Sequence, residues 1–311
     1  MPLLKNPDWP LLIDLYFFLG GLAAGAFVIA TVAHLLGGQR HREVVRVGYY
    51  VALLALIPAP LFLILDLGFP SRFLHMLASF KPDLSIGRGA IILGPLHIKP
   101  FSPMSVGAWG LLGFGLFSLL AALTVFVEGA RPGRSLSTLR TIVGIIGGFF
   151  AFFLAAYPGV LLGASALPLL QNAHVLGLLF LAVGMTSGAA AITLILSAMG
   201  PTTSTSLAPL RRIIIPSLTL QVLAIALFLA AVRTSGAEGA TQALAHLLGG
   251  GYGVVFWLGA VVVGSLVPLV ITLRSRPGPA VRPMVVAAVL ILVGGFLVKY
   301  VIIAAGQVVV S

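Results

Sequence analysis

Long apolar runs separated by short polar joints dominate this sequence from end to end. A stretch of roughly 20 apolar residues can cross the hydrocarbon core of a bilayer as one helix. The pattern therefore predicts an all-α polytopic membrane protein, a helical bundle with eight transmembrane helices in a single integral membrane domain over residues 1–311. The predicted spans cover about residues 11–37, 45–68, 104–127, 140–163, 173–198, 211–232, 252–273 and 283–307.

Composition supports this prediction and limits the chemistry of the protein. Hydrophobic residues make up 59% of the sequence, charged residues 8%, and the mean hydropathy is +1.15, which excludes a soluble domain. Cysteine is absent, so this protein forms no disulfide and ligates no iron–sulfur cluster through thiolates. Any redox centre that it serves must belong to a partner or diffuse in the membrane.

The net charge of +11 comes from 18 Lys and Arg residues that lie almost wholly in the joints between spans. This distribution predicts membrane topology and gives no reason to expect a nucleic-acid partner. The joints after the first, third, fifth and seventh spans carry eleven basic residues, against six on the other face. Because basic residues favour the cytoplasmic side, both termini are predicted to be external, which means periplasmic in the inner membrane of a bacterium.

The joint over residues 69–103 is much longer than most of the others, and long loops in compact proteins often have a function. Residues 71–77 predict a short interfacial helix. Residues 91–98, interrupted by Gly94 and Pro95, predict a segment that either dips into the interface or pairs as a hairpin. Two roles are open for this loop: a lid that faces lipid, and a docking surface for a partner.

The positions of the histidines argue against haem and against a metal site. A bis-histidine haem requires paired histidines that project from helices into a buried space. Four of the six histidines lie in predicted joints, while His34 and His174 lie near the ends of different spans on opposite faces. The sequence therefore predicts neither haem nor a bound metal ion.

Polar residues within the predicted spans gather towards the outer face. A carboxylate at bilayer depth costs at least a few kcal/mol, so such residues usually face the protein interior and have a function. From the direction of each helix and its rise of about 1.5 Å per residue, these polar residues are expected to lie at about the same depth in the membrane. Trp109, near the outer end of the third span, is expected to anchor the protein at the interface. The outer polar group contains Asp14, Tyr16, Asp66, Tyr157, Gln171, Asn172, His174 and Lys299.

Several stretches together resemble the family named for NrfD and for the membrane subunit of polysulfide reductase. The first span contains Asp-Leu-Tyr-Phe-Phe at 14–18 and a glycine-rich run at 20–26, and the second ends in Asp-Leu-Gly at 66–68. The similarity continues through residues 102–109, Tyr-Pro-Gly-Val-Leu-Leu at 157–162 and Lys-Tyr-Val at 299–301. The resemblance therefore covers nearly the whole sequence.

The resemblance implies a haem-free membrane subunit of a prokaryotic respiratory oxidoreductase. Such a subunit exchanges electrons between quinone or quinol, either menaquinone or ubiquinone, and an iron–sulfur ferredoxin-like partner, which works in many complexes with a molybdopterin-type catalytic subunit. Tyr157 matches a tyrosine of the family's quinone pocket, Asp66 matches the aspartate of the family's Asp-Leu-Gly string, and Tyr16 lies where some relatives carry histidine. The sequence departs from the family in having Lys299 where arginine is common, and in residues 83–101, which resemble an insertion.

Quinone chemistry then suggests a role for each residue. Tyr157 is expected to hydrogen-bond a quinone oxygen, and Asp14 and Asp66 to relay protons. Tyr16, His174 and Lys299 complete the predicted binding set. The glycine pair at 21 and 25 predicts close helix packing. A secondary transporter would also carry intramembrane aspartates, but no inverted repeat is visible in the sequence. A purely structural anchor is the third alternative.

Overall fold

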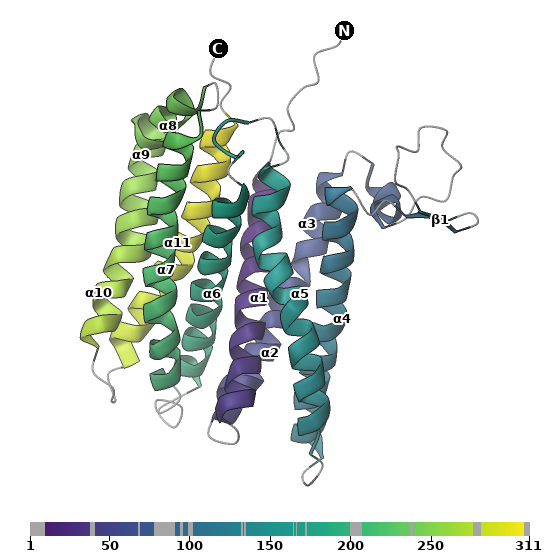
Figure 1. Cartoon of the computed structure of the whole chain (residues 1–311). Helices are drawn as coiled ribbons and strands as arrows, with labels where there is room; N and C mark the ends of the chain where they lie inside the picture. Colours follow the sequence, from purple (N-terminus) through teal and green to yellow (C-terminus); the bar gives the residue numbers. More distant parts are fainter. Residues whose placement is uncertain are drawn as a thin grey trace.

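A computed structural model of the protein shows long helices packed side by side (Figure 1). It describes residues 10–37, 41–67, 69–77, 91–93, 96–98, 102–131, 133, 135–163, 165, 167–171, 173–199, 207–236, 239–275 and 281–307. Six long helices each cross the bundle without interruption: α1 (Leu11–Gly37), α4 (Pro103–Ala130), α5 (Ser137–Gly163), α6 (Ala173–Ala198), α7 (Leu207–Thr234) and α11 (Val281–Gly306).

The two remaining crossings are built from shorter pieces placed end to end. One consists of α2 (Arg42–Leu56) and α3 (Pro58–Asp66), and the other of α9 (Gly250–Val254), the π-helix η4 (Val255–Leu266) and α10 (Val267–Arg274). Eight segments in the described part of the protein are thus long and apolar enough to cross a membrane, which confirms the predicted fold class. The start of α1 and the end of α11 lie at one end of the bundle (Figure 1), here called the termini end.

The break between α2 and α3 follows from proline. Pro58 and Pro60 have no backbone N–H, so the regular hydrogen-bond ladder cannot continue through this point. Pro58 takes the first position of α3, where a missing donor costs little. The sequence pattern predicts a continuous run here, because proline does not interrupt the apolar character of the segment.

The seventh crossing differs from a regular helix because of its 12-residue π-helix. The hydroxyl of Ser265 donates to the carbonyl of Ala260, five residues earlier, at 2.9 Å. A Cβ on Gly264 would overlap the backbone of Gly294 in α11, so both glycines are needed for this close approach. The short helix α8 (Ala240–Leu248), which precedes the crossing, is absent from the predicted spans because it is too short to cross a bilayer.

Close packing between α1 and α6 forms the centre of the bundle. A Cβ on Gly25 would overlap the carbonyl of Gly184, and a Cβ on Gly188 would overlap the backbone at Gly25. Glycines spaced four apart on both helices, at 21 and 25 and at 184 and 188, let the two backbones touch. The close packing predicted from the glycine pair of the first span is therefore confirmed.

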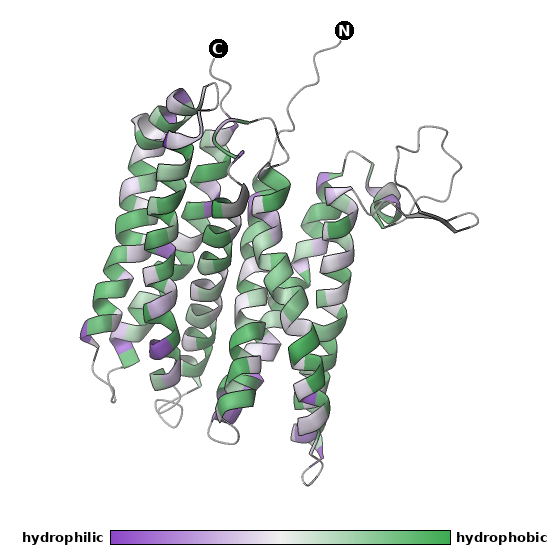
Figure 2. Cartoon of the chain, in the orientation of Figure 1, coloured by the Kyte–Doolittle hydropathy of each residue, from purple (hydrophilic) through white to green (hydrophobic). Residues whose placement is uncertain are grey.

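Hydrophobic residues predominate along the long helices (Figure 2), and many of the large ones are exposed on the outside of the bundle. Large side chains such as those of Phe126, Phe149 and Leu223 are more than half exposed. This pattern is expected of helices whose outer surface contacts lipid.

The long joint after α3 contains a short helix and a hairpin. The 3-10 helix η2 (Pro70–Met76) follows α3, and strand β1 (Ile91–Leu93) pairs antiparallel with β2 (Leu96–Ile98). Both features agree with the sequence prediction, and the hairpin alternative is the correct one. Most of the predicted insertion at 83–101 lies outside the described residues.

Candidate functional site

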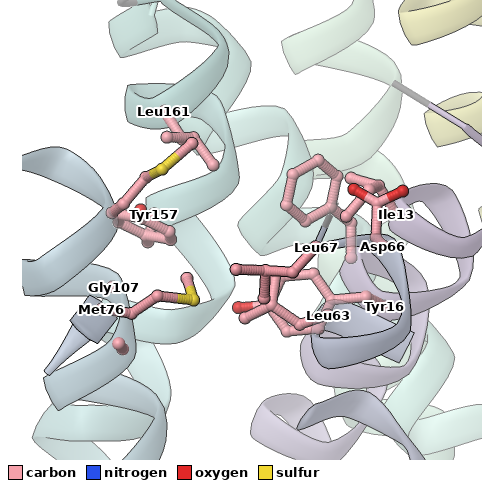
Figure 3. Close-up of a pocket in the computed structure, with 12 residues that line it drawn as sticks. Ile13, Tyr16, Leu63, Asp66, Leu67, Met76, Gly107, Tyr157 and Leu161 are labelled. Carbon is pink, nitrogen blue, oxygen red and sulfur yellow. The ribbon is translucent and has the colours of Figure 1, made fainter. Parts of the chain in front are cut away.

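A cavity of about 300 Å³ lies between α1, α3, α4 and α5 near the termini end. Most of its lining is apolar, and its polar groups are two phenols and one carboxylate. Figure 3 shows Tyr157 and Leu161 on one side of the cavity and Tyr16, Leu63 and Asp66 on the other. The lining residues are Ile13, Tyr16, Phe17, Leu63, Asp66, Leu67, Met76, Met104, Gly107, Ala108, Tyr157 and Leu161.

Tyr157 is held in place by α4. Its hydroxyl donates a 2.7 Å hydrogen bond to the carbonyl of Pro103. A Cβ on Gly107 would overlap the Tyr157 ring, so glycine at this position lets the ring lie directly on the α4 backbone. Since the Tyr157 proton is used on Pro103, the hydroxyl oxygen still has a lone pair free to accept a hydrogen bond from a ligand.

Tyr16 reaches the cavity from α1, opposite Tyr157 (Figure 3). Its side chain is buried and packs against the ring of Phe17, with ring centroids 5.3 Å apart. Both phenols line the same cavity. Ile13, Tyr16 and Phe17 all line the cavity because residues three and four apart share one face of a helix.

Asp66 is the carboxylate of the cavity and the last residue of α3. The last turn of a helix carries partial negative charge, so a carboxylate placed there is unfavourable unless it binds a proton or a positive partner. Its side chain is only partly buried, and no ion pair joins it to another residue in the described part of the protein. Asp66 is therefore available to a ligand or to a proton.

Asp14 is close to the cavity in sequence but does not line it. Its side chain is 2% exposed, and Oδ1 has no hydrogen-bond partner among the described residues. Positions 14 and 16 lie about 200° apart around the helix, so Asp14 and Tyr16 face different neighbours.

Lys299, in α11, is fully buried and contacts the backbone of α1. Its Nζ donates to the carbonyl of Phe17 at 2.6 Å and lies 5.0 Å from the centre of the Phe180 ring. Gly21 leaves room for the ammonium group, because a Cβ there would lie 2.7 Å from Nζ. Lys299 does not line the cavity, but the residue whose carbonyl it binds does.

The structure thus brings Tyr16, Asp66 and Tyr157 together around one cavity and places Asp14 and Lys299 outside its lining. His174 lies in the first turn of α6, and its side chain is outside the described part of the protein. No group of three or more potential metal ligands occurs among the described residues. Sequence reasoning missed Met76, Met104 and Gly107, because a methionine or glycine in an apolar run carries no chemical signal of its own.

The fold and this cavity define a polytopic membrane protein with a ligand-sized site near one end of its bundle. The chain belongs to the family described as "Polysulphide reductase, NrfD", whose sequence pattern matches residues 5–311. It is 26% identical to the "Protein NrfD homolog" of Haemophilus influenzae, over 98% of this chain and 96% of that protein. It is 27% identical to a component of the polysulfide reductase of Wolinella succinogenes, over 96% of this chain and 93% of that one.

A shorter match links the chain to a component of the selenate reductase of Mesobacillus selenatarsenatis, with 30% identity over 24% of this chain and 18% of that protein. The family resemblance inferred from the sequence motifs is therefore confirmed.

Proposed function

We propose that this protein is the quinone- and quinol-reactive membrane subunit of a respiratory oxidoreductase. The observation that carries the proposal is the cavity at the termini end, which is apolar except for the phenols of Tyr16 and Tyr157 and the carboxylate of Asp66. Small-molecule sites have this composition: a mostly apolar wall with a few polar groups that fix orientation.

The cavity fits a quinone ring in size and chemistry. A volume of about 300 Å³ is at the lower end of the range for ligand pockets, which suits a single ring, with the isoprenoid tail outside among lipids. Phenols on opposite walls could each reach one of the two ring oxygens. Interconversion of quinone and quinol, when it occurs here, supplies the transfer of two electrons and two protons.

The residues of the protein would orient the ring and move its protons. The hydroxyl of Tyr157 donates its proton to the carbonyl of Pro103, so its oxygen accepts a hydrogen bond from a ring hydroxyl of the quinol. Tyr16, on the opposite wall, donates to or accepts from the second oxygen. Asp66 takes up and releases the proton, because its half-buried position connects the cavity to the surface.

Asp14 and Lys299 take supporting roles in the proposal. The buried Oδ1 of Asp14 has no described partner, so Asp14 can hold a proton behind the wall formed by Ile13 and Tyr16. Lys299 fixes the backbone of α1 at Phe17, and so acts on the cavity without touching the ring. His174 remains a predicted member of the binding set.

We further propose that the termini end is external, as the distribution of basic residues predicts. Protons released in the cavity would then leave to the outside. The relatives' names place them in polysulfide and selenate reductases, and by analogy an iron–sulfur ferredoxin-like subunit, with a molybdopterin-type catalytic subunit, would dock at this end and exchange electrons with the cavity.

Isolation of the protein from native membranes under mild detergent tests the proposal. Co-purification with an iron–sulfur subunit, extractable quinone and quinol-dependent reduction of the cluster are expected. A solitary protein that transports a solute would show a secondary transporter instead. Iron–sulfur partners without quinone, together with unchanged cluster reduction after removal of Tyr157, would show a structural anchor.

A further inference from the structure

The indole of Trp109 connects α4 to the segment that follows α3. Its Nε1 donates a 2.9 Å hydrogen bond to the backbone carbonyl of Leu77, the residue that follows the last residue of η2. Trp109 lies two residues beyond Gly107, on which the Tyr157 ring rests. The hydrogen bond therefore joins the end of η2 to the part of α4 that forms the cavity wall.

The segment held in this way contributes directly to the cavity. Met76, the last residue of η2 and the neighbour of Leu77, lines it. Figure 3 shows the Met76 side chain between the wall formed by Tyr157 and Gly107 and the wall formed by Leu63 and Tyr16. A methionine adapts its shape to what it contacts more readily than other apolar residues do. Its position, however, depends on where the η2 backbone is fixed.

Large apolar side chains of η2, and of the residue before it, are exposed. Phe73 is 40% exposed, Leu74 is 48% exposed, and the preceding Phe69 is 67% exposed. A 3-10 turn of seven residues has poor internal hydrogen-bond geometry and is not stable alone. The position of η2 is therefore set by its attachments, and the bond from Trp109 is one of them, beside Met76.

We propose that Trp109 is a positioning residue of the cavity: its indole N–H holds the carbonyl of Leu77 and thereby keeps Met76 in place as one wall of the binding site. Loss of this bond releases η2 and opens the cavity at Met76. The ring-binding role of the cavity rests on the proposed function, whereas the control of Met76 by Trp109 does not.

The absence of cysteine makes a direct test possible. In the complex purified with the full-length protein bearing Met76→Cys, the rate of labelling by a small maleimide, read on the band of this protein, reports the exposure of position 76. Trp109→Phe keeps an aromatic ring and removes the N–H. Because one hydrogen bond contributes about 1 kcal/mol, the labelling rate is expected to rise about fivefold.

Two controls separate the release of η2 from general disruption. Trp257→Phe, at a 44% exposed tryptophan in η4, is the matched substitution and should leave the labelling rate at position 76 unchanged. Leu74→Cys, at a position that is already exposed, should react with the maleimide at the same rate whether residue 109 is Trp or Phe. Unchanged labelling of position 76 in the Trp109→Phe protein would overturn the proposal.

A second variant and a kinetic measurement distinguish loss of the hydrogen bond from poor folding of the Trp109→Phe protein. Trp109→His retains a ring N–H and should restore part of the protection of position 76. With a soluble quinol analogue, Trp109→Phe should raise KM about fivefold and leave kcat unchanged. Loss of folded protein would lower the apparent kcat instead. If the protein does not react with quinol at all, the proposed function fails while the labelling result still decides the role of Trp109.

Discussion

Polar side chains in two regions of the bundle differ in their hydrogen bonding. Between α6, α7 and η4, the hydroxyl of Thr186 donates to Oε1 of Gln221 at 2.8 Å, and Nε2 of Gln221 donates to the hydroxyl of Ser265 at 2.8 Å. Around the cavity, Asp66 has no described ion pair and Oδ1 of Asp14 has no described partner. Partnered groups join helices, whereas unpartnered groups beside a cavity have bonding capacity left for a ligand.

A similar contrast exists within the first five helices. At the end opposite the termini, Glu128 forms an ion pair with Arg140 and accepts a 2.6 Å hydrogen bond from the amide of Leu136. Arg140 also donates to the hydroxyl of Thr124 at 3.2 Å. These groups lie on the same helices, α4 and α5, as the cavity, but they are joined to one another or to the backbone by an ion pair and hydrogen bonds. We therefore expect substitutions in the cavity to affect turnover, and substitutions in the partnered groups to affect stability.

The largest effect is expected for Tyr157→Phe. Removal of the hydroxyl leaves the ring on Gly107 but takes away the group that we propose contacts the ring oxygen, so quinol-linked turnover should fall about 100-fold with the protein still in the membrane. Steady-state turnover of the purified complex measures this change. Tyr252→Phe, in α9, is the control and should be silent; near-normal turnover in Tyr157→Phe would remove Tyr157 from the mechanism.

Asp66→Asn should slow turnover by about 10- to 100-fold and change quinone affinity much less, because the amide keeps the shape but cannot carry the proton. Turnover and equilibrium binding of a quinone analogue, measured on the same preparation, separate the two effects. If binding alone is lost, Asp66 is a ligand contact and not a proton carrier.

Gly107→Ala should reduce turnover about tenfold, because it should displace the side chain of Tyr157. The new Cβ would overlap the Tyr157 ring and displace its hydroxyl from Pro103, and a misplacement of about 1 Å is enough to lower a rate strongly. Gly148→Ala is the matched control, since a Cβ there meets nothing within 4 Å. Equal turnover in the two variants would mean that the contribution of Tyr157 to turnover does not depend on its position against α4.

The smallest effect on activity is expected for Gln221→Leu. The substitution removes the hydrogen bonds to Thr186 and Ser265, and interhelical bonds of this kind contribute about 0.6 kcal/mol on average in membranes. Thermal unfolding should therefore occur a few degrees lower while turnover stays the same. A loss of turnover in folded protein would connect this network to the site and break the distinction between the two regions.

Depth in the membrane could be predicted for the polar residues, but their orientation could not. Helix direction and rise place Asp14, Tyr16 and Lys299 near one face, yet only Tyr16 of these three lines the cavity. The direction in which a side chain points depends on the rotation of each helix against its neighbours, and that rotation is fixed by contacts such as those of Gly25 with Gly184. An apolar run does not specify these contacts.

The sequence by itself determined the eight crossings and the family, because hydrophobic length and local motifs act within one segment. For residues 91–98 it left a hairpin and an interfacial segment open, and the structure decided for the hairpin. Tertiary structure decided which polar groups meet, how Tyr157 is seated on Gly107, and that Trp109 reaches Leu77 across 32 positions of sequence. Such contacts join segments distant in the sequence, so they arise only when the helices pack.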